Sequence, residues 1–386
     1  MEKYWEISGW ENEDYHLKKM NQMPFRRQFP FIPKDNGLYV IRGPRQIGKT
    51  SWLKTVLSEY AKDHPCFYLS CENITDHREL TEILRSVSHC KLVLLDEVSF
   101  VKDWDRSVKY AVDSGWTSIL MITGSHAHDL KKGADQMPGR FGGGGEFYLL
   151  PMSFDEFYEA RLEAGWVGED RVKELEVYFR VGGFPTAVAE AGLEARTPVK
   201  ARETYLRWLK GDIVKLGKNE AMMEELLIQL ALTQTTPLSF QTLAKKTTIG
   251  SHNTVQDYIS ILESCFALRT LHAIDLDTKA HRLKKDRKFY FTDPLIFWIA
   301  HDLSGVTQKE ELLYPKLAEL VAHTELARSH RRFGYHSNSD GEIDFIMPGE
   351  WAVEVKWSDV ATNLSKSYLK LVSPNKRVWS KNNFLL

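Results

Sequence analysis

Residues 38–54, LYVIRGPRQIGKTSWLK, decide the fold of the first part of the chain. The apolar run Leu38–Ile41 is followed at once by Gly43-x4-Gly48-Lys49-Thr50. The glycines let backbone N–H groups curl around phosphates, and a helix that begins at the loop directs the positive end of its dipole towards them. This spacing predicts a strand, a phosphate-binding loop and a helix, the entry to an α/β nucleotide-binding domain.

The chemistry of the loop indicates ATP with Mg²⁺. Lys49 would neutralise the β- and γ-phosphates, and the Thr50 hydroxyl would hold the metal ion. The residues predicted to contact the nucleotide are Gly43, Pro44, Arg45, Gln46, Ile47, Gly48, Lys49, Thr50 and Ser51.

Further short apolar runs follow the loop, at Cys66–Leu69, Leu92–Leu95, Ile119–Ile122 and Phe147–Leu150. They are bounded by turn residues and separated by segments of helix length. Runs of this kind predict a buried parallel sheet in an α/β domain.

Acidic residues follow the run Leu92–Leu95, which ends in Asp96-Glu97. At the tip of a buried strand, about 45 residues after the phosphate loop, Asp96 can order the Mg²⁺ shell. Glu97 can orient or deprotonate the attacking water. Asp96 and Glu97 are therefore predicted catalytic residues together with Lys49.

Two further catalytic candidates each have a structural alternative. The run Ile119–Ile122 leads to Ser125, which is either a polar group beside the γ-phosphate or the N-cap of a helix over residues 126–130. Arg140 precedes a glycine-rich loop and is either a contact to the γ-phosphate of its own or a neighbouring subunit, or a solvated loop arginine. His126 and His128 lie two residues apart, and surface histidines are the favoured interpretation.

Composition sets limits on the class of protein. A chain of 386 residues predicts two or three domains, and 43% hydrophobic with 27% charged residues excludes a disordered protein. Lys plus Arg number 51 against 52 Asp plus Glu, so a nucleic-acid contact needs a local basic patch. The four cysteines form no CxxC pair, and no apolar stretch approaches 18 residues. We expect reduced thiols, no membrane contact and a cytoplasmic location.

Several phrases together resemble a known family: GPRQIGKTSWL, LVLLDEV, ITGS, PGRF, LLPMSFDEF, YFRVGGFP and FTDP. In this order, over about residues 30–360, they are similar to the archaeal-type AAA+ ATPases that carry a DUF4143 C-terminal region. The resemblance implies an α/β fold in which a P-loop parallel sheet with a helical lid is followed by a winged helix. A small α/β restriction-endonuclease-like domain of the PD-(D/E)XK type would come last. The expected domains are an arm at 1–36, an AAA ATPase core at 37–150, a helical lid at 151–235, a winged helix-turn-helix at 236–300 and the nuclease-like domain at 301–386.

Residues 239–271 have a helix–turn–helix rhythm independently of that resemblance, and a basic segment follows them. Residues 279–288 hold six basic side chains, which indicates a hairpin that contacts DNA phosphates. The alternative is a winged helix used for protein packing, with a solvated hairpin. The predicted DNA contacts are Ser251, Asn253, Lys279, Arg282, Lys284, Lys285 and Arg287, and Lys288 is counted in the same patch.

The C-terminal region offers a second constellation of charged residues. Asp344 and, on the next expected strand, Glu354 and Lys356 have the Asp-x9-Glu-x-Lys spacing of PD-(D/E)XK nucleases, with Glu319 on the preceding helix. Asp344 and Glu354 can bind Mg²⁺, and Lys356 can activate water against a phosphodiester. The alternatives are surface charge on an edge strand, or carboxylates that hold Mg²⁺ or DNA without cutting.

The favoured function is a Mg²⁺-dependent AAA-type ATPase that couples ATP hydrolysis to DNA binding or remodelling, with endonuclease activity left open. The alternatives are a slow nucleotide-gated switch and a transcriptional regulator with an inactive nuclease-like domain. A role of Arg140 in a neighbouring subunit would require a homo-oligomer.

Overall fold

The computed structural model describes residues 4–6, 9–124, 130, 133, 135, 137–168, 170–330, 332–359 and 363–385. It divides into two compact units. The first holds residues 1–151 and 159–165, and the second holds residues 152–158 and 166–386. The five finer domains expected from the sequence stay a prediction.

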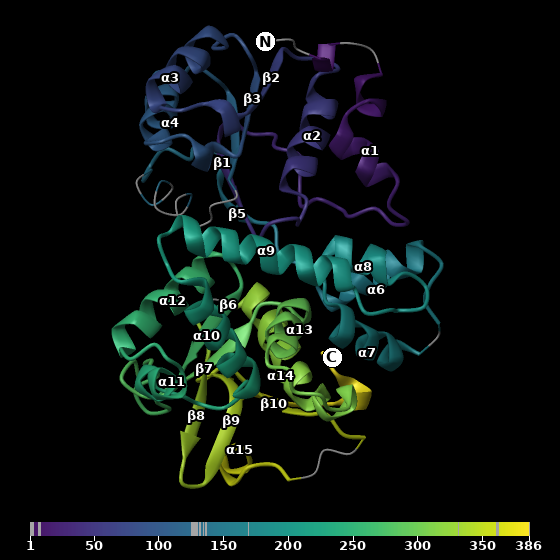
Figure 1. Cartoon of the computed structure of the whole chain (residues 1–386), viewed down its shortest axis with the longest axis vertical. Helices are drawn as coiled ribbons and strands as arrows, with labels where there is room; N and C mark the ends of the chain where they lie inside the picture. Colours follow the sequence, from purple (N-terminus) through teal and green to yellow (C-terminus); the bar gives the residue numbers. More distant parts are fainter. Residues whose placement is uncertain are drawn as a thin grey trace. The chain divides into compact units, whose positions relative to one another are not determined.

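The first unit is built on a parallel five-stranded sheet (Figure 1). Its strand order is β2-β3-β4-β1-β5, so β4 lies between the strand of the phosphate loop and the strand that ends in Asp96. All residues of β3 and β4 are buried, as short apolar runs of a parallel sheet require. The strands are β1 (Gly37–Arg42), β2 (Cys66–Ser70), β3 (Leu92–Asp96), β4 (Ile119–Thr123) and β5 (Gly145–Tyr148).

The predicted boundaries of β5 were wrong by two residues. Gly145 pairs with Tyr39 of β1 and Tyr148 with Arg42, so the paired segment ends before Leu149. The apolar Leu149 is buried after the strand has ended, and its N–H donates to the carbonyl oxygen of Arg42. The predicted strand was therefore too long at its end because it included Leu149, which is apolar and buried but lies beyond the paired segment.

Polar residues fix where several helices of the chain begin. The carboxylate of Asp14 accepts hydrogen bonds from the N–H groups of His16 and Leu17 at the beginning of the first helix. The carboxylate of Asp76 caps the third helix in the same way, with N–H groups of that helix. The helices of the first unit are α1 (Tyr15–Asn21), α2 (Lys49–Tyr60), α3 (His77–Ser86) and α4 (Trp104–Asp113), and α6 (Phe154–Glu163) has residues in both units.

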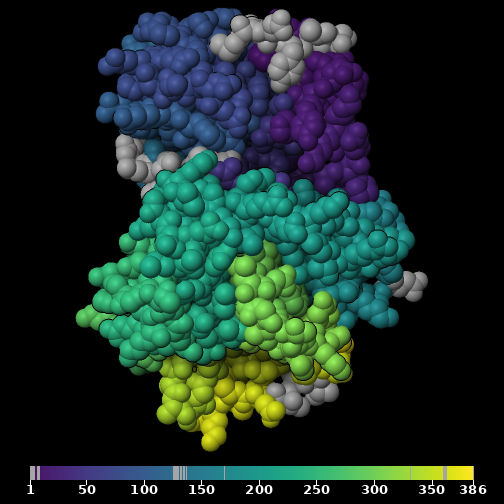
Figure 2. Space-filling model, viewed as in Figure 1, coloured from purple at the N-terminus to yellow at the C-terminus, as the bar shows by residue number. Residues whose placement is uncertain are grey.

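The second unit begins with helices. They are α7 (Arg171–Val181), α8 (Pro185–Ala191), α9 (Val199–Lys215), α10 (Glu220–Leu232), α11 (Phe240–Lys246), α12 (His252–Ser264), α13 (Pro294–Leu303) and α14 (Tyr314–Ser329). Helix α13 is apolar over most of its surface and packs against α7, α9 and α10. In Figure 2 the light green segment near residue 300 lies beside teal helical residues. Gly217, with a positive φ of 68°, lies between α9 and α10.

Two sheets complete the second unit. Strands β6 (Leu268–His272) and β7 (Arg287–Phe291) pair antiparallel, and Leu238 bridges to Arg287. A four-stranded sheet follows, in the order β11-β10-β9-β8, with β10 parallel to β11 and the other pairs antiparallel. Its elements are β8 (Gly334–Asn338), β9 (Gly341–Met347), β10 (Trp351–Lys356), α15 (Lys366–Lys370) and β11 (Asn375–Ser380).

Strands β8 and β11 were not expected from the sequence. Strand β8 ends in polar residues, and the first three residues of β11 are exposed, so neither presents a continuous apolar run. Short 3₁₀ helices lie at Tyr4–Glu6, Trp10–Asn12, Cys71–Asn73, Val98–Phe100, Glu310–Leu312 and Lys381–Asn383. Three of the four free cysteines are buried, and burial raises the pKa of the Cys66 thiol to about 12. Over the part of the chain that the structure describes, no helix has the length and apolar character to cross a membrane.

Candidate functional site

The phosphate loop joins β1 to α2 in a tightly curled conformation. Gln46 and Gly48 have positive φ angles of 57° and 97°, and Gly48 precedes the first turn of α2. The buried Lys49 ammonium donates to the carbonyl oxygens of Gly43 at 2.9 Å and Pro44 at 2.7 Å. A Cβ atom on Gly43 would lie 2.0 Å from the Leu149 carbonyl oxygen, so this glycine allows the backbones to approach. The loop therefore has the curled form that the glycine spacing predicts.

The N-terminal arm contacts this loop, which sequence reasoning missed. Arg27 donates from Nη1 to the carbonyl oxygen of Ile47 at 2.7 Å and from Nη2 to that of Leu150. The Phe29 ring stacks on Trp52 of α2, with 6.0 Å between ring centroids, and is the nearest group to a Cβ on Gly48. The arm therefore supports the outer side of the loop. A cluster of aromatic and basic residues before β1 was the signal available in the sequence.

Asp96 lies at the carboxyl end of β3, where it is 3% exposed. Its carboxylate accepts hydrogen bonds from the Thr123 hydroxyl and, at 3.1 Å, from the Tyr68 hydroxyl. Thr123 ends β4, the strand between β1 and β3, so it lies between the phosphate loop and Asp96. Tyr68 was not predicted, because alternation in β2 gives no sign of what its hydroxyl contacts.

Glu97 takes a left-handed conformation directly after β3, with φ at 56°. Its N–H donates to the Thr123 hydroxyl at 3.4 Å. Positive φ at a non-glycine residue is costly and is concentrated at functional sites. The loop, Asp96, Glu97 and Thr123 thus meet at the carboxyl edge of the sheet, where α/β proteins bind ligands.

Arg140 does not lie at that edge. Its guanidinium pairs with Asp113, the last residue of α4, at 2.8 Å and 3.0 Å, and Gly142 bridges to Gly37 at the start of β1. This is the amino edge of the sheet, so Arg140 does not reach the phosphate loop of its own chain. A role in a neighbouring subunit stays a prediction. Ser125, His126 and His128 lie outside the described residues.

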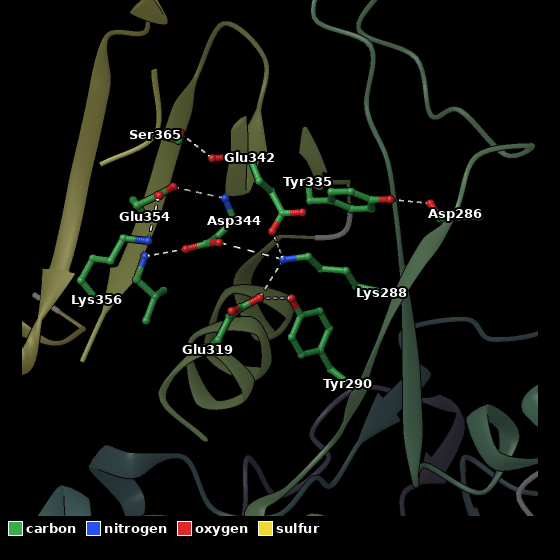
Figure 3. A network of polar contacts seen from close by, with 11 residues as sticks. Asp286, Lys288, Tyr290, Glu319, Tyr335, Glu342, Asp344, Glu354, Lys356 and Ser365 are labelled. Carbon is green, nitrogen blue, oxygen red and sulfur yellow. Dashed lines mark hydrogen bonds and ion pairs between the residues drawn. The ribbon is translucent and has the colours of Figure 1, made fainter. Parts of the chain in front are cut away.

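The C-terminal charged residues Asp344, Glu354 and Lys356 lie close together (Figure 3). The N–H of Val355 donates to Oδ2 of Asp344 at 2.8 Å, which joins β10 to the Asp344 side chain on β9. The Lys356 ammonium lies 3.0 Å from Oε1 of Glu354. Burial, with a smaller contribution from Asp344, raises the pKa of Glu354 to about 7, against the opposing effect of Lys356.

A second group of acidic residues surrounds Lys288. Its ammonium lies 2.9 Å from Oε1 of Glu319 on α14, 2.5 Å from Oε1 of Glu342 and 4.0 Å from Oδ1 of Asp344, the last two on β9. The Tyr290 hydroxyl donates to Glu319 at 2.6 Å. We call Glu319, Glu342, Asp344 and Glu354, with Lys288 and Lys356, the C-terminal carboxylate cluster.

The prediction that Lys288 belongs to an exposed basic patch was wrong, because its side chain is 0% exposed. Residues two apart on a strand share a face, so Lys288 points inward with Tyr290. The signal available was that Lys288 directly precedes the apolar run Phe289–Phe291, within which both faces of the strand are buried. Glu342, which shares a face of β9 with Asp344, was also missed.

The other basic residues of this segment remain at the surface. Residues 279–286 are exposed, Arg282 lies 3.6 Å from Asp275, and Lys285 donates to the carbonyl oxygen of Ser337 at 3.2 Å. Arg287 is half-buried over the ring of Phe240. Earlier in the chain than β6, Ser251 and Asn253 are exposed at the beginning of α12.

Both candidate sites offer oxygen donors of the kind that Mg²⁺ binds. In the described ranges no group of three or more His, Cys, Asp or Glu residues is placed to hold a metal ion. Mg²⁺ usually binds one or two carboxylates and takes its other ligands from water and phosphates. The adjacent carboxylates of Asp344 and Glu354 fit that requirement, and so do the Thr50 hydroxyl and Asp96 carboxylate in company with a nucleotide.

A cavity of about 440 Å³ adjoins the C-terminal carboxylate cluster. Glu319 and Lys356 form part of its wall, together with the second lysine Lys316, the Trp357 ring and the Ser358 hydroxyl. The wall of the cavity therefore combines two ammonium groups, a carboxylate and an aromatic ring.

The strand order, the curled loop and the acidic end of β3 have the arrangement of a P-loop nucleotide-binding domain. Residues 35–158 match the family described as an AAA domain. Residues 172–309 match a domain of unknown function, DUF8612, rather than the DUF4143 region named by the resemblance.

An uncharacterized protein of Methanocaldococcus jannaschii is 24% identical over 345 residues, which cover 82% of this chain and 73% of the relative. Among solved structures, a Walker-type ATPase of Pyrococcus abyssi is 16% identical at a TM-score of 0.48, covering 76% of this chain and 96% of that one. The ORC2 protein of Aeropyrum pernix is 15% identical at a TM-score of 0.38, covering 70% and 88%.

Proposed function

We propose that the chain is a Mg²⁺-dependent AAA-type ATPase that couples ATP hydrolysis to the binding or remodelling of DNA. The observation that carries the ATPase is the meeting of Lys49, Asp96 and Glu97 at one edge of the sheet, with Thr123 between them. The match of residues 35–158 to an AAA domain supports it.

Each residue has a role in hydrolysis. Backbone N–H groups of the loop and the beginning of α2 bind the phosphates, and Lys49 exchanges two carbonyl oxygens for β- and γ-phosphate oxygens. Glu97 orients the attacking water and accepts its proton as the new bond to phosphorus forms and ADP leaves. Bound Mg²⁺ supplies charge neutralisation, with Thr50 and Asp96 holding it or its water ligands. Thr123 and Tyr68 keep the Asp96 carboxylate in one orientation.

The DNA part of the proposal rests on the order of elements after α9. Helices α10, α11 and α12 precede an antiparallel pair, and Leu238 adds a short third segment by its bridge to Arg287. This order supports the winged helix expected from the sequence, in which the beginning of the last helix would enter a groove. Ser251 and Asn253 are exposed there, and the basic residues of 279–285 are available for phosphates.

A nuclease is the second candidate, and the carboxylate cluster favours it. Its carboxylates lie on α14 and on the four-stranded sheet of β8 to β11, which supports the PD-(D/E)XK domain expected from the resemblance. Asp344 and Glu354 would hold Mg²⁺, and Lys356 would orient water against a phosphodiester whose nucleotide enters the adjoining cavity.

Phosphate release from ATP and Mg²⁺ tests the proposal, measured with single-stranded, duplex and branched DNA at one low salt concentration. Stimulation by one form of DNA, absent in Lys49→Ala, is the expected result. A slow rate unchanged by every DNA would contradict coupling and favour a nucleotide-gated switch. Tight binding to one short duplex sequence without stimulation would favour a transcriptional regulator.

A further inference from the structure

Lys288 reaches the C-terminal carboxylate cluster from outside the sheet that carries it. Asp344 and Glu354 lie on β9 and β10, whereas Lys288 lies on β7, which pairs with β6 in a separate sheet. Backbone pairing with Leu271 fixes the position of Lys288 along that strand. The cluster is therefore assembled from two sheets and helix α14.

The two sheets are joined firmly at this point. The N–H of Ile274 donates to the carbonyl oxygen of Tyr335 at 2.7 Å. The Tyr335 hydroxyl in turn donates to the backbone carbonyl oxygen of Asp286. Ile274 also packs in one apolar core with Ile343 and Ile346 of β9. The strand that carries Lys288 is consequently fixed against the sheet that carries the carboxylates. The ammonium of Lys288 is therefore a buried, fixed group and not a mobile surface charge.

The charges require such a cation. A buried ammonium without partners is strongly disfavoured, and so are adjacent buried carboxylates without a cation. The Lys288 ammonium contacts three of the four carboxylates, while Lys356 pairs with the fourth.

We propose that Lys288 is a positioning residue of this site, whose ammonium takes the place of a second divalent cation among Glu319, Glu342 and Asp344. The carboxylates of Asp344 and Glu354 are then left to hold one Mg²⁺. This assignment of the Mg²⁺ rests on the nuclease-like function proposed above. Glu319 is a partner of Lys288 and not a ligand of that Mg²⁺. The site thus contains a positive charge of its own, the Lys288 ammonium, which comes from β7, the strand that follows the exposed segment 279–286.

Mn²⁺ binding to the full chain without nucleotide tests this, with calorimetry and the electron paramagnetic resonance of free Mn²⁺ giving the number of bound ions. Any ion held by the first unit is common to all variants and cancels in the comparison. Lys288→Met should bind one equivalent more than the wild type, and the added equivalent should disappear in Lys288→Met/Glu319→Gln. The same number of ions in Lys288→Met and wild type, or an added ion that survives Glu319→Gln, would overturn the proposal.

Glu319→Gln alone gives a test that does not require the lysine variant to fold. With Lys288 in place, this near-isosteric change should leave the number of bound Mn²⁺ ions unchanged. Loss of an ion would overturn the proposal, because Glu319 would then be a metal ligand. Lys54→Met is the matched control: it removes another buried lysine, which pairs with Asp14, and should bind no additional Mn²⁺.

A third comparison separates failure of this inference from failure of the nuclease-like function. Glu354→Ala should remove the equivalent bound by the wild type. If that variant binds as the wild type does, yet Lys288→Met gains an ion, the assigned Mg²⁺ edge is wrong and the role of Lys288 stands.

Discussion

The N–H of Gly183 donates a hydrogen bond of 2.8 Å to Oδ2 of Asp293, 110 residues further along the chain. The carbonyl oxygen of Gly183 accepts the N–H of Met152 at 2.8 Å, and Oδ1 of Asp293 accepts the N–H of Leu295. One point in the second unit thus joins the phrases LPMSF, GGFP and FTDP. These phrases, which carried the family resemblance, support packing at this point and lie outside both candidate sites.

Gly183→Ala should destabilise the second unit severely. A Cβ atom there would lie 2.1 Å from the carbonyl oxygen and 2.8 Å from the nitrogen of Met152. We expect a loss of at least about 3 kcal/mol in the free energy of unfolding, measured by urea denaturation. Gly211→Ala is the matched control, because a Cβ at that helical position meets open space and should stabilise by about 0.5–1 kcal/mol. Equal stability of both variants would contradict the close approach.

Asp293→Asn should change how stability depends on pH. Burial raises the pKa of Asp293 to about 7, although the N–H groups of Gly183 and Leu295 oppose it. The pKa of Asp293 in the folded chain therefore exceeds its value in the unfolded chain. The contribution of the protonated Asp293 carboxyl to stability is complete below about pH 3.8 and is lost as pH rises through about 7.

The difference between Asn and Asp isolates this group from all others that titrate. Between pH 4.5 and 6.5, the free energy of unfolding of the variant should rise relative to that of the wild type by about 1.4 kcal/mol per pH unit. Urea denaturation at several pH values measures this difference. A difference that stays constant over this range would show that Asp293 has an ordinary pKa.

Lys49→Ala should abolish ATP turnover. The ammonium is the charge placed inside the phosphate loop, and its removal leaves the β- and γ-phosphates without that cation. We expect phosphate release to fall by roughly 100-fold or more. Lys62→Ala, at an exposed lysine just after α2, should release phosphate at the wild-type rate. Unchanged release in Lys49→Ala would place the active site elsewhere.

Removing basic residues of the exposed loop should weaken DNA binding in a salt-dependent way. We expect Lys279→Ala with Lys284→Ala to lower the affinity for every DNA sequence. The slope of log affinity against log salt concentration should become shallower by about 0.9 for each DNA phosphate that the variant no longer neutralises. Fluorescence anisotropy at several salt concentrations measures this. Lys309→Ala, also exposed, is the control, and an equal effect there would point to non-specific charge.

Glu354→Gln should remove any Mg²⁺-dependent cleavage of DNA while ATP turnover persists. The amide cannot supply the second anionic ligand beside Asp344, and the two activities lie in separate compact units. A gel assay with labelled DNA and purified variants measures cleavage. Cutting that continues in the variant would come from a contaminating enzyme.

The first unit was largely predictable because its signals are local. The loop, Asp96-Glu97 and the apolar runs at β1, β3 and β4 follow one another over short stretches, and each was placed within a residue or two. Tyr68 and Arg27 were not found, because their hydrogen bonds join segments that are distant in sequence. Strand order, which brings Thr123 beside Asp96, is likewise a property of the whole sheet.

The amino-acid sequence by itself determined the phosphate loop and the spacing of Asp344, Glu354 and Lys356, since these depend on residue type and period along the chain. The tertiary structure decided which charges are buried together. Lys288, expected in a solvated patch, is the cation of an acidic cluster drawn from β7, α14 and β9. Arg140 lies with Asp113 at the opposite edge of the sheet from the phosphate loop. The physical reason is that the energy of a charge depends on its burial and neighbours, and both are set by folding.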